Sequence, residues 1–238
     1  MKPLLRLAAA VFSLLPAAAA AQASKEAADA QKLFYQANTN AELRATLAAQ
    51  ATGFLGDATF QPGALRTFDG RRRPLPGLRY HPTQHVLQAQ DSLDTEKTQL
   101  WPLGSLRGFD IGEEETVPRR FRPRLVREGS LGSRREFVEV LTTLEGGPLL
   151  LAWVYTAPPA DAGSSTPVPV LVVGPGFSAT ADPLRPLELT QAAVLKLFGG
   201  RAEEIRAFAM SQKLSFGQPA DVARLVDHFN RVAVMILK

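Results

Sequence analysis

The pattern of apolar and polar positions changes twice along the chain. From residue 53 to residue 189, glycine and proline recur every several residues, and the segments between them are rich in Val, Leu, Phe, Tyr, Trp and Thr. Short segments of this composition between turn residues are typical of β-strands. The regions on either side have helical character, so the chain predicts an α+β fold, with a mostly antiparallel β domain between helices.

The clearest predicted hairpin joins residues 136–144 to residues 149–155 through a turn. Its second strand, which contains Trp153, is apolar on both faces, so we expect it to be covered on both sides and to form the centre of the core. Residues 157–169 lack apolar periodicity and predict a loop. Residues 167–173 then predict another strand, which its two prolines place at an edge.

Earlier hairpins are predicted in the first half of the β-rich region. One turns at Asp69-Gly70, where glycine tolerates the positive φ that a tight turn requires. A second turns at residues 81–85, between the apolar segments 78–80 and 86–90. Both are typical of a meander of neighbouring strands.

Helices are predicted at both ends of the β domain. Residues 24–52 are rich in Ala, Lys, Glu, Gln and Leu, and Asn38-Thr39-Asn40 is expected to divide them into two helices. From Thr190, a helix cap, residues 190–238 predict three helices, the last with an apolar stripe at Val222, Leu225, Val226, Phe229 and Val232. The connection through residues 186–189 is too short for a flexible linker, so this module should pack on the β domain.

The first 23 residues have the parts of a secretory signal peptide. Lys2 and Arg6 precede a short apolar run, and small residues follow that fit a cleavage site near Gln22 or Ser24. A membrane anchor is the alternative, but the run is shorter than the ~20 residues that span a bilayer, and no later segment is long and apolar enough. We therefore expect an exported protein, periplasmic or secreted, divided at residues 1–23, 24–52, 53–189 and 190–238.

Composition narrows the chemistry further. The chain has no cysteine, which excludes disulfides, thiol catalysis and cysteine metal sites. Removing the leader, which carries Lys2 and Arg6 and no acidic residue, lowers the formal net charge from +4 to about +2. So small a charge argues against nucleic acid as a partner. The sequence leaves the oligomeric state open.

Two constellations suggest catalysis or metal binding only weakly. His81 and His85 could meet across a turn, but a third ligand is not evident, and a catalytic zinc site normally needs three. The segment from Gly174 to Ser178 is not a Gly-x-Ser-x-Gly turn, and a nucleophilic serine needs a base within reach. We predict no metal, no cofactor and no catalytic residue from them.

Arginines form the sharper candidate site. On an extended strand Arg120, Arg122 and Arg124 share one face, because successive side chains alternate sides. This face, enlarged by Arg127, Arg134, Arg135 and the run at residues 71–73, could bind an anionic glycan, a lipid headgroup or nucleic acid. The alternative is a solvated edge strand whose charges prevent aggregation, with the acidic residues 113–115 close by in sequence.

A set of turn and strand segments recurs in a recognisable order along the chain. They are Asp69-Gly70, residues 78–90, Trp101-Pro102-Leu103, residues 106–109, Arg119-Arg120-Phe121, residues 137–141, residues 147–151 and residues 226–230. Together they resemble a family of exported, uncharacterised proteins common in Bacteroidetes. The resemblance covers about residues 53–230, and a long loop at residues 157–169 departs from it. It implies a β-rich envelope protein and carries no known activity, catalytic residue or cofactor.

Two functions remain open from the sequence. The first is a non-catalytic binding protein of the bacterial envelope, whose partner is an envelope protein or an anionic glycan or lipid. The second is an envelope hydrolase with carboxylates among Asp57, Asp69, Asp91 and Asp94. Such a hydrolase needs two carboxylates that converge in a cleft, one of them with a raised pKa.

Overall fold

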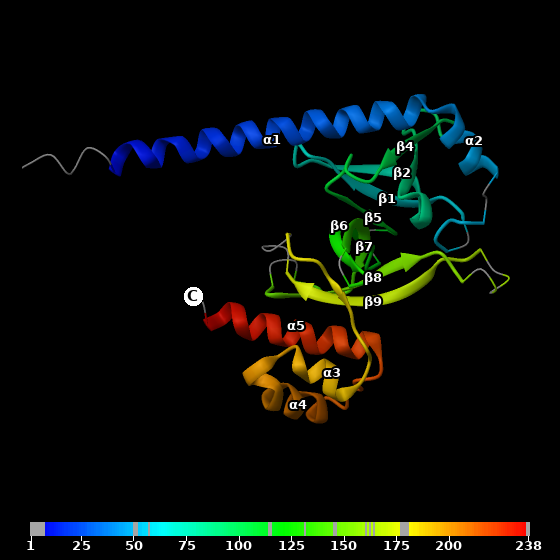
Figure 1. Ribbon diagram of the computed structural model, residues 1–238. Helices are drawn as coiled ribbons and strands as arrows, with labels where there is room; N and C mark the ends of the chain where they lie inside the picture. The colour runs from blue at the N-terminus through cyan, green and yellow to red at the C-terminus, as the bar shows by residue number, and fades with distance from the viewer. Residues whose placement is uncertain are drawn as a thin grey trace, which may run out of the picture.

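The fold is one antiparallel sheet with helices at both ends of the chain (Figure 1). The computed structural model describes residues 8–236 apart from 50–51, 57, 114–115, 131, 145–146, 160, 162, 164 and 177–180. The helices are α1 (Ala8–Thr39), α2 (Ala41–Ala49), α3 (Gln191–Lys196), α4 (Ala202–Ser211) and α5 (Pro219–Ile236), with the 3₁₀ turns η1 (Pro82–Gln84) and η3 (Gly199–Arg201). None of these described helices is both long and apolar enough to cross a bilayer.

Ten strands form the sheet, in the order β10-β9-β8-β7-β6-β5-β1-β2-β3-β4. They are β1 (Gln61–Arg66), β2 (Arg72–His81), β3 (Val86–Gln90), β4 (Thr98–Pro102), β5 (Gly108–Ile111), β6 (Arg119–Glu128), β7 (Gly132–Val140), β8 (Leu149–Thr156), β9 (Val168–Pro175) and β10 (Arg185–Pro186). The pairs between these named strands are antiparallel. The α+β class predicted from the sequence is confirmed.

The N-terminal helix lies across the first strands. Helix α1 runs without a break from the predicted leader to Thr39. The predicted division of the region 24–52 is confirmed at Asn40, whose side-chain oxygen accepts a hydrogen bond from the Leu43 amide at 3.0 Å and begins α2. Asn38 attaches α1 to β4 through hydrogen bonds with the backbone nitrogen and oxygen of Leu100, at 3.0 and 2.8 Å.

Both early hairpins are confirmed. Strands β1 and β2 turn at Asp69-Gly70, where Gly70 has a φ of +80° and its amide donates to the Thr67 carbonyl at 3.1 Å. Strands β2 and β3 turn through η1 and His85, which takes a left-handed φ of +52°. These turns stack β1 to β4 side by side over an aromatic core that includes Tyr80 and Phe109.

The predicted central hairpin is present, but its second strand has a different main partner. Strand β8 pairs with β9 over eight residues, from Leu149↔Pro175 to Thr156↔Val168. Its described pairs with β7 are Glu139↔Trp153 and Val140↔Ala152 only. Strand β9 has only the two-residue β10 on its outer side, as its prolines predicted.

The sheet closes on itself around β6 to β9. Leu184 donates to the Leu125 carbonyl of β6 and accepts from the Arg127 amide, both at 2.8 Å, while the next residue, Arg185, pairs with Val173 of β9. One short segment therefore joins β6 to β9. The apolar cluster enclosed by these strands is Val126, Val138, Val140, Leu150, Ala152, Val154, Val172 and Leu184.

The C-terminal helices pack on the other face of β8 and β9 (Figure 1). Alternate strand residues such as Leu151 and Val173 contact Val222 and Leu225 of α5. Polar anchors fix the position of α5: the Asn230 side chain accepts from the Leu149 amide at 3.0 Å and donates to its carbonyl at 2.8 Å.

Candidate functional site

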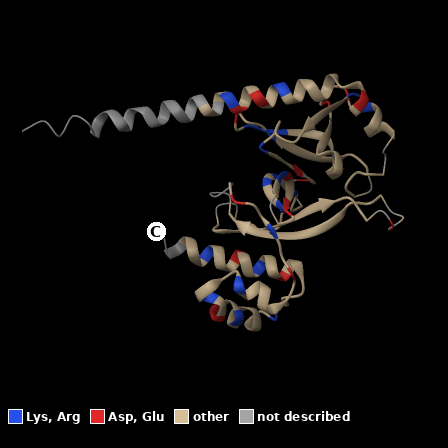
Figure 2. Ribbon diagram, viewed as in Figure 1, with Lys and Arg blue, Asp and Glu red and all other residues tan. Residues whose placement is uncertain are grey.

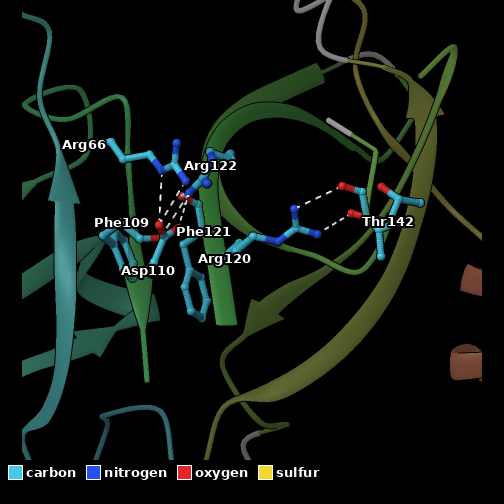
Figure 3. Close-up of polar contacts among 8 residues, drawn as sticks. Arg66, Phe109, Asp110, Arg120, Phe121, Arg122 and Thr142 are labelled. Atoms are coloured by element: carbon cyan, nitrogen blue, oxygen red, sulfur yellow. Dashed lines mark hydrogen bonds and ion pairs between the residues drawn. The ribbon is translucent and has the colours of Figure 1, made fainter. Parts of the chain in front are cut away.

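The three arginines predicted as a ligand site lie on one face of β6, but two of them are buried. Arg122 is 5% exposed and Arg124 is 1% exposed, while Arg120 is half-buried. Arg120 donates to the backbone carbonyls of Thr142 and Thr143, on the chain just after β7 (Figure 3). The expectation of a solvent-facing arginine strip is therefore wrong for Arg122 and Arg124.

Arg122 belongs to a buried charge cluster. The Asp110 carboxylate, on β5, lies 2.8 Å from an Arg122 guanidinium nitrogen and 3.1 Å from Arg66 of β1 (Figure 3). Arg122 also donates to the carbonyls of Phe109 and Phe121, at 3.2 and 2.9 Å. Because β5 lies between β1 and β6, this cluster links three neighbouring strands in the middle of the sheet.

Arg124 lies within the closed part of the sheet. Its guanidinium donates to the Pro175 carbonyl of β9 at 2.9 Å, and burial lowers its pKa, with a smaller opposing effect of Asp182. The alternative prediction of a solvated edge strand is also wrong, because β6 has β5 and β7 as neighbours and Leu184 across its end. Ligand binding by the three arginines stays a prediction, and their contacts with the protein's own oxygens argue against it.

A second polar cluster lies on the opposite face of β6 and β7. Arg119 binds both oxygens of Glu139, at 2.8 and 2.7 Å, and donates to the Tyr155 hydroxyl at 2.9 Å. Tyr155 in turn donates to Glu139. Burial, and then the neighbouring carboxylate, raises the pKa of Tyr155. This closed set of partners is typical of a structural network.

The two turn histidines face different surroundings. His81 is 1% exposed, packs against the Phe54 ring, and has its Nδ1 3.2 Å from the Thr83 hydroxyl. Burial lowers its pKa. His85 instead has its Nδ1 2.8 Å from a Glu136 carboxylate oxygen. Within the described part of the chain, no three His, Asp or Glu side chains are grouped to hold a metal ion.

The described carboxylates of the hydrolase hypothesis stabilise turns. Asp69 accepts hydrogen bonds from Thr67 and from the Arg71 amide, and the Thr67 contact lowers its pKa. Asp91 accepts from the Leu93 amide at 2.8 Å, and Asp94 pairs with Lys97 at 2.9 Å. A general acid needs a raised pKa, so Asp69 is unsuited to that role. Asp57 lies outside the described residues, as does Ser178.

Two hollows lie beneath α1. The first, of about 340 Å³, has Gln31, Phe34, Phe68, Arg73, Trp101 and Ser105 in its lining. The second, of about 400 Å³, has Glu26, Asp29, Phe68, Arg124 and Arg135. Both volumes fall in the range of small-molecule pockets. Of the three predicted site residues, Arg124 alone borders one of these two hollows.

The charged side chains that line the two hollows differ in whether they already have a partner within the protein. Arg73 and Arg135 are exposed, and neither forms an ion pair with any residue that the structure describes. Asp69, in the first hollow, is already bonded to Thr67 and lies 3.6 Å from Arg71. Figure 2 shows basic positions on the strands below α1 and both signs of charge along the helix. Two guanidinium groups are thus available to an external anion.

A comparison of the chain with protein-family models, with curated proteins and with solved structures found no match. What the chain does must therefore be inferred from its own residues. The resemblance to exported proteins of Bacteroidetes stays a prediction.

The arginines that border the hollows differ from those that the sequence singled out, apart from Arg124. The sequence places Arg73 and Arg135 among the residues that could enlarge the face on β6, whereas in the structure they border the hollows beneath α1. The contact between Asn38 of α1 and Leu100 of β4, 62 residues apart in the chain, has no local signal. One feature of the sequence could have indicated that Arg73 lacks an ionic partner. The only acidic residue near it in the sequence is Asp69, which is a typical turn residue.

Proposed function

We propose that this chain is an exported, non-catalytic binding protein of the bacterial envelope, and that it recognises an acidic ligand through Arg73 and Arg135. The observation that carries the proposal is the pair of exposed arginines, each bordering a hollow under α1 and neither ion-paired within the described chain. A guanidinium offers five donors in a fixed fork, which suits carboxylate, sulfate and phosphate groups.

The contrast with the other arginines supports this proposal. Arg66, Arg119 and Arg122 have carboxylate partners within 3.2 Å. These three arginines thus have carboxylate partners in the fold, and Arg73 and Arg135 have none among the described residues. The described carboxylates of the hydrolase alternative act in turns, so no observation favours that second function.

Export is supported by the leader at residues 1–23 and is tested by intact mass. Protein recovered from the periplasmic or secreted fraction should have the mass of a chain that begins near Gln22 or Ser24. A full-length chain in the cytoplasm would contradict export, and membrane-bound material that keeps residues 1–21 would make the leader an anchor.

Binding is tested by retention of the purified protein on washed bacterial envelope material over a series of salt concentrations. We expect retention that falls as salt rises, because exposed charges are screened over about 8 Å at physiological ionic strength. The double substitution Arg73→Gln and Arg135→Gln should abolish most of it.

A matched control removes the same charge elsewhere. Arg185 on β10 and Arg231 on α5 are exposed and distant in sequence from the hollows. The protein with the double substitution Arg185→Gln and Arg231→Gln should bind to the envelope material as strongly as the parent. If both double variants lost retention equally, the effect would come from net charge and not from the two arginines at the hollows. If the parent protein were not retained even at low salt, the proposal itself would be contradicted.

A further inference from the structure

The two hollows beneath α1, together called the groove, share the lining residue Phe68. At 100° per residue, Glu26 and Asp29 lie on one flank of α1, and Ala27, Gln31 and Phe34 lie on the other. Ala30, between the flanks, is 6% exposed and packs on the body of the protein. The hollows therefore lie on the two flanks of α1, with Phe68 common to both.

From this arrangement we propose that the groove binds an acidic glycan chain, with a sugar ring on Phe68 and an acidic group at Arg73. The inference rests on the proposed function, and it names the ligand class of the same site. It is carried by three features of the groove: its aromatic floor, its unequal charges, and its position on both flanks of the helix.

The aromatic floor suits sugar rings. Phe34 and Trp101 are in contact at 4.3 Å between ring centroids, with their planes tilted by 42°, and they border the first hollow beside Phe68. The C–H faces of a pyranose are apolar while its hydroxyls lie at the rim, so a sugar packs on an aromatic ring and keeps its polar groups in reach of side chains. The buried Trp101 indole nitrogen has no hydrogen-bond partner among the described residues, which leaves a donor beside this floor.

The charges place the acidic group at one end. In the first hollow the Asp69 carboxylate is held by Thr67 and Arg71, so Arg73 is the charge left for a ligand. In the second hollow Arg135 has Glu26 and Asp29 on the opposite wall, a mixture of donors and acceptors that suits hydroxyl groups. An acidic sugar at Arg73 followed by sugars rich in hydroxyls matches this order.

A lipid fits the groove less well. An acyl chain requires a continuous apolar wall, because its burial is driven by removal of apolar surface from water. Here charged or amide side chains, among them Gln31, Asp29 and Arg135, interrupt the apolar lining of both hollows. The favoured ligand therefore carries its acidic group on a polar chain.

The test uses the fluorescence of Trp101, which borders the first hollow. The chain has one other tryptophan, Trp153, which packs against the C-terminal helices, so a Trp153→Phe background isolates the signal. Three probes are titrated: oligogalacturonate as the acidic glycan, an N-acetylglucosamine oligomer as a neutral glycan, and vesicles containing phosphatidylglycerol. We expect a saturable change with oligogalacturonate and none with the vesicles.

Variants then locate the site. Phe68→Ala and Arg73→Gln should each weaken binding of oligogalacturonate by about tenfold or more, as loss of a central contact does. Phe208→Ala removes another half-buried ring, on α4, and should bind as the parent does. Arg73 is exposed, so its variant tests the site even if Phe68→Ala fails to fold.

Three results would overturn the inference: equal binding by parent and Arg73→Gln, a preference for the neutral oligomer, or a response to vesicles alone. If any of these occurs while retention on envelope material still depends on Arg73 and Arg135, the glycan assignment fails and the proposed function stands. If that retention is also absent, both fail.

Discussion

The arginines inside the sheet and those beneath α1 differ in how the protein satisfies them. Arg122 is 5% exposed and has the Asp110 carboxylate at 2.8 Å and two backbone carbonyls as partners. Arg73 and Arg135 are exposed, and no described residue forms an ion pair with either. A buried charge without a partner would be too costly to keep, so the first set must be paired by the fold. Arg73 and Arg135 are solvated by water, so the fold does not have to supply partners for them.

The neighbours of an arginine in the fold, more than its place in a run of arginines, indicate its role. Arg120, Arg122 and Arg124 form a regular strip in sequence, yet the fold encloses two of them. Arg73 and Arg135 are 62 residues apart, and each borders a hollow that is also lined by residues of α1. The following substitutions are ordered by the size of the effect on the free energy of unfolding.

The largest effect is expected from Asp110→Ala. This substitution leaves the buried Arg122 guanidinium without its carboxylate and removes the contact to Arg66, so it should cost about 3 kcal/mol or more. Urea denaturation followed by circular dichroism measures the loss. Asp91→Ala, which removes a carboxylate from a surface turn, serves as the control and should cost about 1 kcal/mol or less. Equal costs would mean that the buried cluster does not stabilise the sheet.

A buried polar group without charge should give an intermediate effect. Asn230→Ala removes both hydrogen bonds to Leu149 and leaves two partly buried backbone groups without these partners, which costs about 1 to 3 kcal/mol. The same denaturation experiment applies, with Asn38→Ala as a comparison, since Asn38 makes two equivalent bonds to Leu100 under α1. If Asn230→Ala lowered the free energy of unfolding as much as Asp110→Ala, the larger cost expected at Asp110 could not be attributed to its charge.

Protonation of His81 gives a smaller effect with a predicted sign. Burial, and to a lesser extent the positive charges of Arg79 and His85, lowers the pKa of His81 in the folded protein. Below the ordinary histidine pKa of about 6.5 the unfolded chain binds a proton that the folded chain does not, so stability falls as the pH drops below that value. Unfolding midpoints at pH 7.5 and 5.5 should therefore differ less in His81→Gln than in the parent. An equal difference would place the pH dependence in other groups.

The smallest effect on stability is expected in the groove. Arg73→Gln and Arg135→Gln should each change the free energy of unfolding by no more than about 0.5 kcal/mol, because neither side chain has an ionic partner to lose. Denaturation midpoints measure this directly. A loss of 2 kcal/mol or more at either position would assign that arginine to the fold and would remove the distinction between the two sets.

Local patterns in the sequence were sufficient for much of the fold. The Asp69-Gly70 turn, the break at Asn40 and the helix cap at Thr190 each depend on residues within a few positions, and the structure has all three. The closure of β6 to β9 by Leu184 joins segments about 60 residues apart, and no periodicity reports such a contact. The burial of Arg122 and Arg124 follows from that closure and from Asp110. The alternation of side chains along β6 predicts that the arginines share a face, but it does not predict that this face is buried.

The groove is tested most directly by hydrogen exchange with and without oligogalacturonate. We expect added protection of backbone amides in residues 24–39 of α1 and in the β1–β2 turn around Phe68 and Arg73. We expect no change in α3, α4 and α5, which pack on the other end of the sheet. Protection that appears in the C-terminal helices, or along β6 without α1, would contradict the assignment of ligand binding to the groove beneath α1.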